Sequence, residues 1–261
     1  MTSLSSSSPA GTIICMKWGT RYGPEFVNRL YAGIRRHTRM PIRFICMTDN
    51  ADGLHPGVHV YPLPAIDIPA HVDRVKPWPK LAVWQDPLFD ITGDVLFLDI
   101  DMVVTGPLDD FFTYEPGEYC VIENWTQLGQ GIGNTSVFRF PVGRYKKIYD
   151  DFAVDPMTIM RDYKIEQQYI SAMIPEQKFW PREWCVSFKH SCIPPFPLNW
   201  IKTPKLPDGA RLVAFTGKPD PDEAAVGAWP SVWYKKVYKH IRPVNWITEN
   251  WQDPDMNANG F

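Results

Sequence analysis

The chain has 261 residues, of which 44% are hydrophobic and 21% are charged, a composition typical of a soluble globular protein with a full-sized core. Its formal net charge of −2 excludes a general electrostatic attraction to nucleic acid or to an anionic membrane, although a local basic patch could still exist. We therefore expect no nucleic-acid partner.

The first predicted elements alternate between strand and helix. Short apolar runs predict strands at residues 12–16, 43–48 and 58–61, and Pro24 opens a helix that extends to residue 36 with apolar side chains at helical spacing. This β-α-β-β order predicts a Rossmann-like α/β fold with a mostly parallel central sheet flanked by helices.

After a proline-rich connection, residues 80–88 have helical character, and residues 94–100 form a nearly unbroken apolar run that predicts a strand buried on both faces. The remaining predicted elements are strands at residues 136–140 and 211–215 and helices at residues 142–152, 166–173 and 233–241. Because no repeat or linker divides the chain, we expect one domain over residues 12–261.

Targeting and redox features are weak. The five cysteines are odd in number and include no Cys-x-x-Cys pair, which argues against a zinc site or a disulfide framework. Residues 1–11 lack the basic start and apolar stretch of a signal peptide, so we expect a disordered tail. No apolar run approaches the length that crosses a bilayer. These features predict a cytoplasmic protein with reduced thiols.

Two aspartates, Asp99 and Asp101, end the apolar run of residues 94–100. At the carboxyl end of a strand the chain can turn and bring both carboxylates onto one hard cation, and ligands of open α/β sheets bind at that edge. A pair of solvated turn aspartates is the plain alternative. The apolar strand that leads into the pair favours a metal site that holds the diphosphate of a nucleotide-sugar.

The same pattern also fits a phosphatase of the haloacid-dehalogenase type, in which the first carboxylate attacks phosphorus and Mg²⁺ screens the charge. That chemistry needs a second acidic pair on a later strand end. The late candidate is the segment 219–223, whose two prolines make a poor metal platform. The phosphatase is therefore the second hypothesis.

The order of several motifs resembles that of the bacterial glycosyltransferases related to glycosyltransferase family 8, which have the GT-A fold. The resemblance extends from Thr12 to about Glu223. The motifs are Trp18 to Tyr22, Phe44 to Asp49, Trp78-Pro-Lys-Leu81, Leu98-Asp-Ile-Asp101, Gly133-Asn-Thr-Ser136, Glu166-Gln-Gln168 and Phe215-Thr-Gly-Lys-Pro219. Each motif is weak alone, and their shared order carries the resemblance.

The resemblance implies a role for each matching residue. Asp99 and Asp101 would bind Mn²⁺ or Mg²⁺, and Asp99 would also reach the ribose of the donor. Tyr22 would stack on the base of the nucleotide, with Trp18 nearby, and Lys80 would lie near the diphosphate and the donor sugar. These assignments predict a nucleoside-diphosphate sugar, above all a UDP-sugar, as the ligand.

The later motifs imply the sugar side of the site. Asn134 and Ser136 would contact the donor sugar. Glu166 would orient that sugar or stabilise its cationic transition state, and Gln167 would lie beside the anomeric carbon.

One motif departs from the family. Relatives carry a histidine near residue 215 as a third metal ligand, and this chain has Ala214-Phe-Thr-Gly217 instead, so dependence on a metal is open. Gly217 and Lys218 remain as contacts for the diphosphate.

The sequence therefore predicts a glycosyltransferase. Its single domain would have a donor-binding part at about 12–140 and an acceptor-side part at about 141–261. The expected acceptor is a bacterial surface glycan or glycolipid, with the anomeric configuration retained. Any membrane contact would be peripheral, through Trp246 and Trp251. A non-catalytic nucleotide-sugar-binding protein is the third hypothesis, because the family's histidine is missing.

Overall fold

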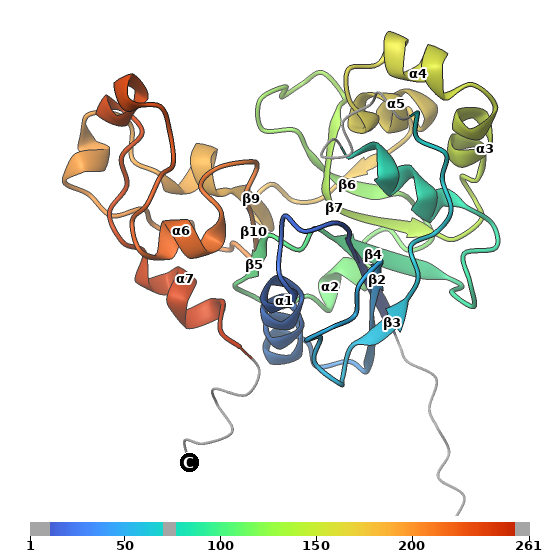
Figure 1. Ribbon diagram of the computed structural model, residues 1–261, viewed down its shortest axis with the longest axis horizontal. Coiled ribbons are helices and arrows are strands. Elements are labelled where there is room, and N and C mark those ends of the chain that lie inside the picture. Colours follow the sequence, from blue (N-terminus) through green and yellow to red (C-terminus); the bar gives the residue numbers. More distant parts are fainter. Residues whose placement is uncertain (1–10, 70–76, 254–261) are drawn as a thin grey trace, which may run out of the picture.

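The computed structural model describes residues 11–69 and 77–253, and its centre is a seven-stranded sheet (Figure 1). In spatial order the strands are β3 (His59–Tyr61), β2 (Ile42–Thr48), β1 (Gly11–Lys17), β4 (Asp94–Leu98), β7 (Gly133–Pro141), β6 (Cys120–Glu123) and β8 (Lys178–Phe179). Four of the six neighbouring pairs are parallel, and β7 is antiparallel to both β4 and β6. The predicted α/β fold with a mostly parallel sheet is confirmed.

Both faces of this sheet are covered, which the alternation along β1 explains. Ile13 and Cys15 point to one core cluster, whereas Ile14 and Met16 point to the other. The first cluster lies under α1 (Pro24–His37), α2 (Asp110–Thr113) and a small sheet of β5 (Met102–Val104), β10 (Leu212–Ala214) and β9 (Cys185–Ser187). The second lies under the 3₁₀ helix η1 (Trp78–Trp84), α3 (Lys147–Val154), α4 (Pro156–Asp162) and α5 (Glu166–Met173).

The C-terminal segments close the first cluster. The π-helical turn η2 (Phe188–Cys192) and the short helices α6 (Pro221–Ala225) and α7 (Asn245–Asn250) contribute residues to it. The 3₁₀ turns η3 (Leu198–Trp200) and η4 (Trp233–Val237) lie in the same part of the chain and contribute none. Trp251 is buried and packs edge-on against Phe26 of α1, and Trp246 is half-buried with its indole bonded to Pro204. Trp251 is therefore not available for the predicted membrane contact, because it packs into the fold, and Trp246 offers only part of its ring.

Several predicted elements differ from the structure. The segment expected to form a helix at 80–88 is the 3₁₀ helix η1, which ends before the cis bond between Asp86 and Pro87. The helix expected at 233–241 is only η4, which buries no residue and is rich in aromatic and β-branched side chains of low helix propensity. The tail expected over 1–11 lies outside the described residues except for Gly11, which begins β1.

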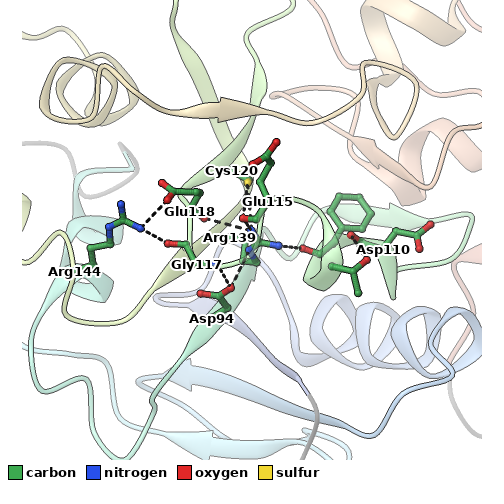
Figure 2. Close-up of polar contacts among 10 residues, drawn as sticks. Asp94, Asp110, Glu115, Gly117, Glu118, Cys120, Arg139 and Arg144 are labelled. Carbon is green, nitrogen blue, oxygen red and sulfur yellow. Dashed lines mark hydrogen bonds and ion pairs between the residues drawn. The ribbon is translucent and has the colours of Figure 1, made fainter.

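A buried arginine ties the strands to the loop that precedes β6 (Figure 2). Arg139 of β7 is 0% exposed. Its guanidinium donates to the backbone oxygens of Phe111 at 2.5 Å and of Glu115, and its Nε lies 3.7 Å from the carboxylate of Asp94 on β4. Buried carbonyl groups need a hydrogen-bond donor, and the guanidinium of Arg139 supplies donors to more than one of them.

Among the described residues no helix is both long enough and apolar enough to cross a bilayer. All five cysteines are buried and unpaired, as the sequence predicts.

Candidate active site

A cavity of about 590 Å³ opens at the edge of the large sheet where the parallel strands β1 and β4 end. This carboxyl edge is the usual ligand-binding edge of an open α/β sheet. The loops that follow β1 and β4 both line the cavity. Ten of the eleven residues singled out from the sequence line it as well: Trp18, Tyr22, Lys80, Asp99, Asp101, Asn134, Ser136, Glu166, Gln167 and Gly217.

Lys80 and Asp99 form the most closely contacting ion pair of the cavity. Lys80 is 7% exposed, and its Nζ lies 2.6 Å from Oδ1 and 2.8 Å from Oδ2 of Asp99. Burial lowers the pKa of Lys80, but the charges of Asp99 and Glu166 outweigh that effect and raise the pKa. Lys80 is therefore a fixed positive charge inside the cavity and not a solvated lysine on a helix surface.

Asp101 is the second carboxylate of the pair. Burial and the nearby charge of Asp99 raise the pKa of Asp101 to about 7, against the opposing effect of Lys80. The hydroxyl of Tyr22 lies 3.4 Å from Oδ2 of Asp101 and 3.4 Å from Oδ1 of Asp220. Burial and these two carboxylates raise the pKa of Tyr22 far above its usual value, so the hydroxyl keeps its proton.

Asp220 was not singled out as part of the site, although it lies in the late acidic segment. It is buried, begins α6, and forms an ion pair with Lys218 at 2.8 Å. Lys218 also contacts Glu223 at 2.6 Å and is not among the residues that line the cavity. The structure thus does not support Lys218 as a free contact for a diphosphate, because its ammonium neutralises two carboxylates of α6.

Glu166 enters the cavity from the first turn of α5. It is 1% exposed, and its Oε1 accepts a hydrogen bond from the hydroxyl of Thr135 at 2.5 Å, whereas its buried Oε2 has no hydrogen-bond partner. Burial raises the pKa of Glu166, and Lys80 and Thr135 oppose the shift. A buried polar atom without a partner is unusual and costly. The neighbouring Gln167 accepts a 3.4 Å bond from Asn124.

Thr135 is a second residue that the sequence analysis missed. Besides holding Glu166, its backbone oxygen accepts a 3.3 Å bond from Lys80. The residues on either side are fixed locally, because Oδ1 of Asn134 accepts from the amide of Ser136 at 3.0 Å, and the amide of Asp99 donates to the oxygen of Ser136 at 2.9 Å. The Asn134–Ser136 segment therefore links β4 to α5.

Gly217 lines the cavity together with the two residues that precede it, Phe215 and Thr216. Its φ of +66° lies in the left-handed region that favours glycine. A β-carbon there would meet the ammonium of Lys189 at 3.7 Å, and that ammonium donates to the backbone oxygen of Thr216. Lys189 therefore stabilises the turn at Thr216 and Gly217 by its hydrogen bond to the backbone.

The donor set for a metal is small. The described part of the chain contains no group of three His, Cys, Asp or Glu side chains that could hold an ion. Mg²⁺ and related hard cations are often held by one or two carboxylates together with substrate phosphates. Asp99 and Asp101 therefore fit a divalent cation shared with a diphosphate, and do not fit a cation held by protein ligands alone.

The fold is that of the GT-A glycosyltransferases, as comparison with solved structures shows. The galactosyltransferase LgtC, solved with donor and acceptor sugar analogs, superposes with a TM-score of 0.55 at 12% identity over 80% of this chain and 88% of LgtC. GlyE of Streptococcus pneumoniae gives 0.54 at 14% identity over 81% of this chain and 56% of GlyE. The bifunctional glycosyltransferase WbbM gives 0.57 at 13% identity over 83% of this chain.

The chain spans 47% of the length of WbbM, so it corresponds to only part of that protein. No family model and no curated protein sequence matches the chain. At these identities the likeness establishes the fold, and the chemistry has to be argued from the cavity.

Proposed function

We propose that the protein is a glycosyltransferase that moves a sugar from a nucleoside-diphosphate sugar, namely a UDP-sugar, to a hydroxyl acceptor. One observation carries the proposal: the paired carboxylates, the buried Lys80 and the buried Glu166 line a single cavity at the carboxyl edge of a GT-A fold. These groups match the charges of a reacting donor, which has an anionic diphosphate beside a sugar carbon that becomes cationic.

Each residue then has a distinct task. Trp18 and Tyr22 would contact the base, and Lys80 would attract the diphosphate. A divalent cation held by Asp99 and Asp101 would supply positive charge to the leaving diphosphate. Trp18, Tyr22, Asp99 and Asp101 follow the ends of β1 and β4, whereas Lys80 reaches the cavity from η1.

The sugar would occupy the opposite side, between the Asn134–Ser136 segment and α5. Asn134 and Ser136 would contact its hydroxyls, and Gln167 would lie beside the anomeric carbon. The Oε2 of Glu166 lacks a hydrogen-bond partner, so it would be available to a sugar hydroxyl or to the developing positive charge. This arrangement is consistent with transfer that retains the anomeric configuration, because front-face attack by the acceptor needs no strong base from the protein.

The acceptor would be a glycan or a glycolipid of a bacterial surface, built in the cytoplasm. The five buried, unpaired cysteines support a reducing compartment. The fold likeness to glycosyltransferases favours transfer over the phosphatase hypothesis.

The test is a donor-consumption assay. The protein is incubated with a panel of UDP- and GDP-sugars and Mn²⁺, and the released nucleoside diphosphate is measured. We expect slow release with one donor, which Asp101→Asn reduces by about 10² or more, the usual cost of a lost electrostatic contact in an active site. The matched control Asp52→Asn, at an exposed aspartate outside the cavity, leaves release unchanged.

Other outcomes assign another function. Release of phosphate from simple phosphomonoesters would support the phosphatase. Tight binding of a donor with no release, even with simple sugars as acceptors, would support the non-catalytic nucleotide-sugar-binding protein.

A further inference from the structure

The C-terminal part carries an exposed aromatic and basic surface at the end of the molecule opposite α3 and α4 (Figure 1). Ten of the fifteen large hydrophobic side chains that are exposed among the described residues lie between residues 196 and 238. They are Phe196, Leu198, Trp200, Ile201, Val226, Val232, Trp233, Tyr234, Val237 and Tyr238. We define the aromatic tip as residues 193–206 and 226–243.

The two segments of the aromatic tip are held together. The amide of Asn199 donates to the backbone oxygens of Tyr238 at 2.9 Å and His240 at 2.8 Å, and the indole of Trp200 donates to Val237 at 2.8 Å. The Trp200 ring also stacks on His240 with centroids 4.0 Å apart. The exposed side chains therefore share one ordered surface.

The charge of this surface has one sign. The aromatic tip contains Lys202, Lys205, Lys235, Lys236, Lys239 and Arg242, and it contains no aspartate or glutamate. The whole chain, in contrast, has a net charge of −2. Six cations beside exposed indole and phenol rings are the combination that favours the headgroup region of an anionic bilayer.

A second cavity of about 580 Å³ lies within the aromatic tip. Trp200 and Trp229 form part of its wall, and Lys236, Lys239 and His240 also line it. The ammonium of Lys239 lies 5.6 Å from the centre of the Trp229 ring. Two ammonium groups beside apolar rings, one of them over the Trp229 ring, suit a phosphate that is attached to a lipid.

From these observations we propose that the aromatic tip docks the protein on an anionic lipid surface, with a lipid phosphate in the cavity lined by Lys236 and Lys239. Trp233, which is 82% exposed, and Tyr234 enter the interface beside it. A second copy of the chain is a poorer occupant, because a two-fold contact through this surface would place six cations opposite six cations. Neutral membranes lack the charge that the lysines match.

Docking on a lipid surface does not depend on the proposed transfer reaction. It would, however, fix the position of the first cavity relative to the membrane. The indole of Trp229 donates to the backbone oxygen of Lys218 at 3.1 Å, and Lys218 follows Gly217 of the first cavity. The lipid-facing surface and the first cavity are thus joined by one short segment. A protein docked in this way would meet an acceptor that is itself in the membrane.

The test measures sedimentation of the full chain with vesicles of phosphatidylcholine, with and without phosphatidylglycerol. We expect binding to the anionic vesicles only. One surface lysine contributes about 1 kcal/mol, or about fivefold, so Lys235→Gln with Lys236→Gln weakens binding by about 25-fold. The control pair Lys146→Gln with Lys178→Gln removes two exposed lysines from other elements and leaves binding unchanged.

Trp233→Ser tests the aromatic contribution, with Val154→Ser as the control at another highly exposed apolar residue. We expect weaker vesicle binding only for Trp233→Ser, with unchanged thermal unfolding for both. Equal binding to neutral and anionic vesicles, or full binding by the lysine variant, would overturn the proposal. Concentration-dependent dimers that Trp233→Ser abolishes would assign the surface to a second copy instead.

Discussion

Replacing Lys80 by methionine tests whether the buried charge organises the cavity. Methionine keeps most of the apolar stem and removes the ammonium that contacts both oxygens of Asp99 and the backbone of Thr135. Asp99 is only 22% exposed, so its carboxylate would lose its counter-charge in a place that water reaches poorly. Breaking a buried ion pair costs about 3–5 kcal/mol. Because Asp99 keeps some solvent, we expect the lower end of that range, about 3 kcal/mol.

For a chain of this size a loss of about 3 kcal/mol lowers the melting temperature by roughly 6–12 °C. The assay is thermal unfolding followed by circular dichroism without added metal, with Lys146→Met as the control at an exposed lysine. A melting temperature for Lys80→Met within a degree of the unaltered protein would refute the reasoning, because it would mean that Asp99 does not depend on Lys80.

Two further predictions follow from the same structure. The pKa of Asp101, raised to about 7, means that protons compete with a cation below pH 7. Mn²⁺ affinity measured by calorimetry with UDP present, which supplies the diphosphate ligands, should therefore be about tenfold weaker at pH 6 than at pH 8, and equal affinity at both would contradict the assignment. Arg139→Met leaves several buried carbonyl groups without a donor and Asp94 without its partner, and should cost about 3–5 kcal/mol in urea unfolding. The neighbouring Arg144→Met, which breaks a more exposed pair with Glu118, should cost less than about 1 kcal/mol (Figure 2).

The sequence was sufficient to predict the sheet and the position of the cavity. The apolar runs of β1, β2 and β4 are typical of strands buried on both faces of a parallel sheet, and this pattern does not depend on the loops between them. The resemblance to family 8 glycosyltransferases assigned Trp18 and Asp99 to one site, and the structure places both on one cavity because β1 and β4 are parallel neighbours. The order of the weak motifs then located Glu166 on the same edge.

The sequence did not predict contacts that depend on packing between distant segments. Thr135 gains its role only because β7 lies between Lys80 of η1 and Glu166 of α5. The sequence predicted that Lys218 could contact a diphosphate. In the structure its ammonium contacts Asp220 and Glu223, and these two residues come together only because they form the capping box of α6.

The sequence pattern also did not predict that the two segments of the aromatic tip form one surface. Its two segments are separated in the chain by α6 and β10, and each alone reads as ordinary loop. Residues 233–241 even have the spacing of a helix, but no apolar face exists for that helix to cover.

The central claim is that Glu166 acts on the sugar of a bound nucleotide donor. Its most direct test is donor turnover and donor affinity measured side by side for Glu166→Gln, the isosteric change that removes only the charge. We expect turnover to fall by about 10²–10³ while the donor still binds within a few-fold of its normal affinity. Full turnover by Glu166→Gln would contradict it.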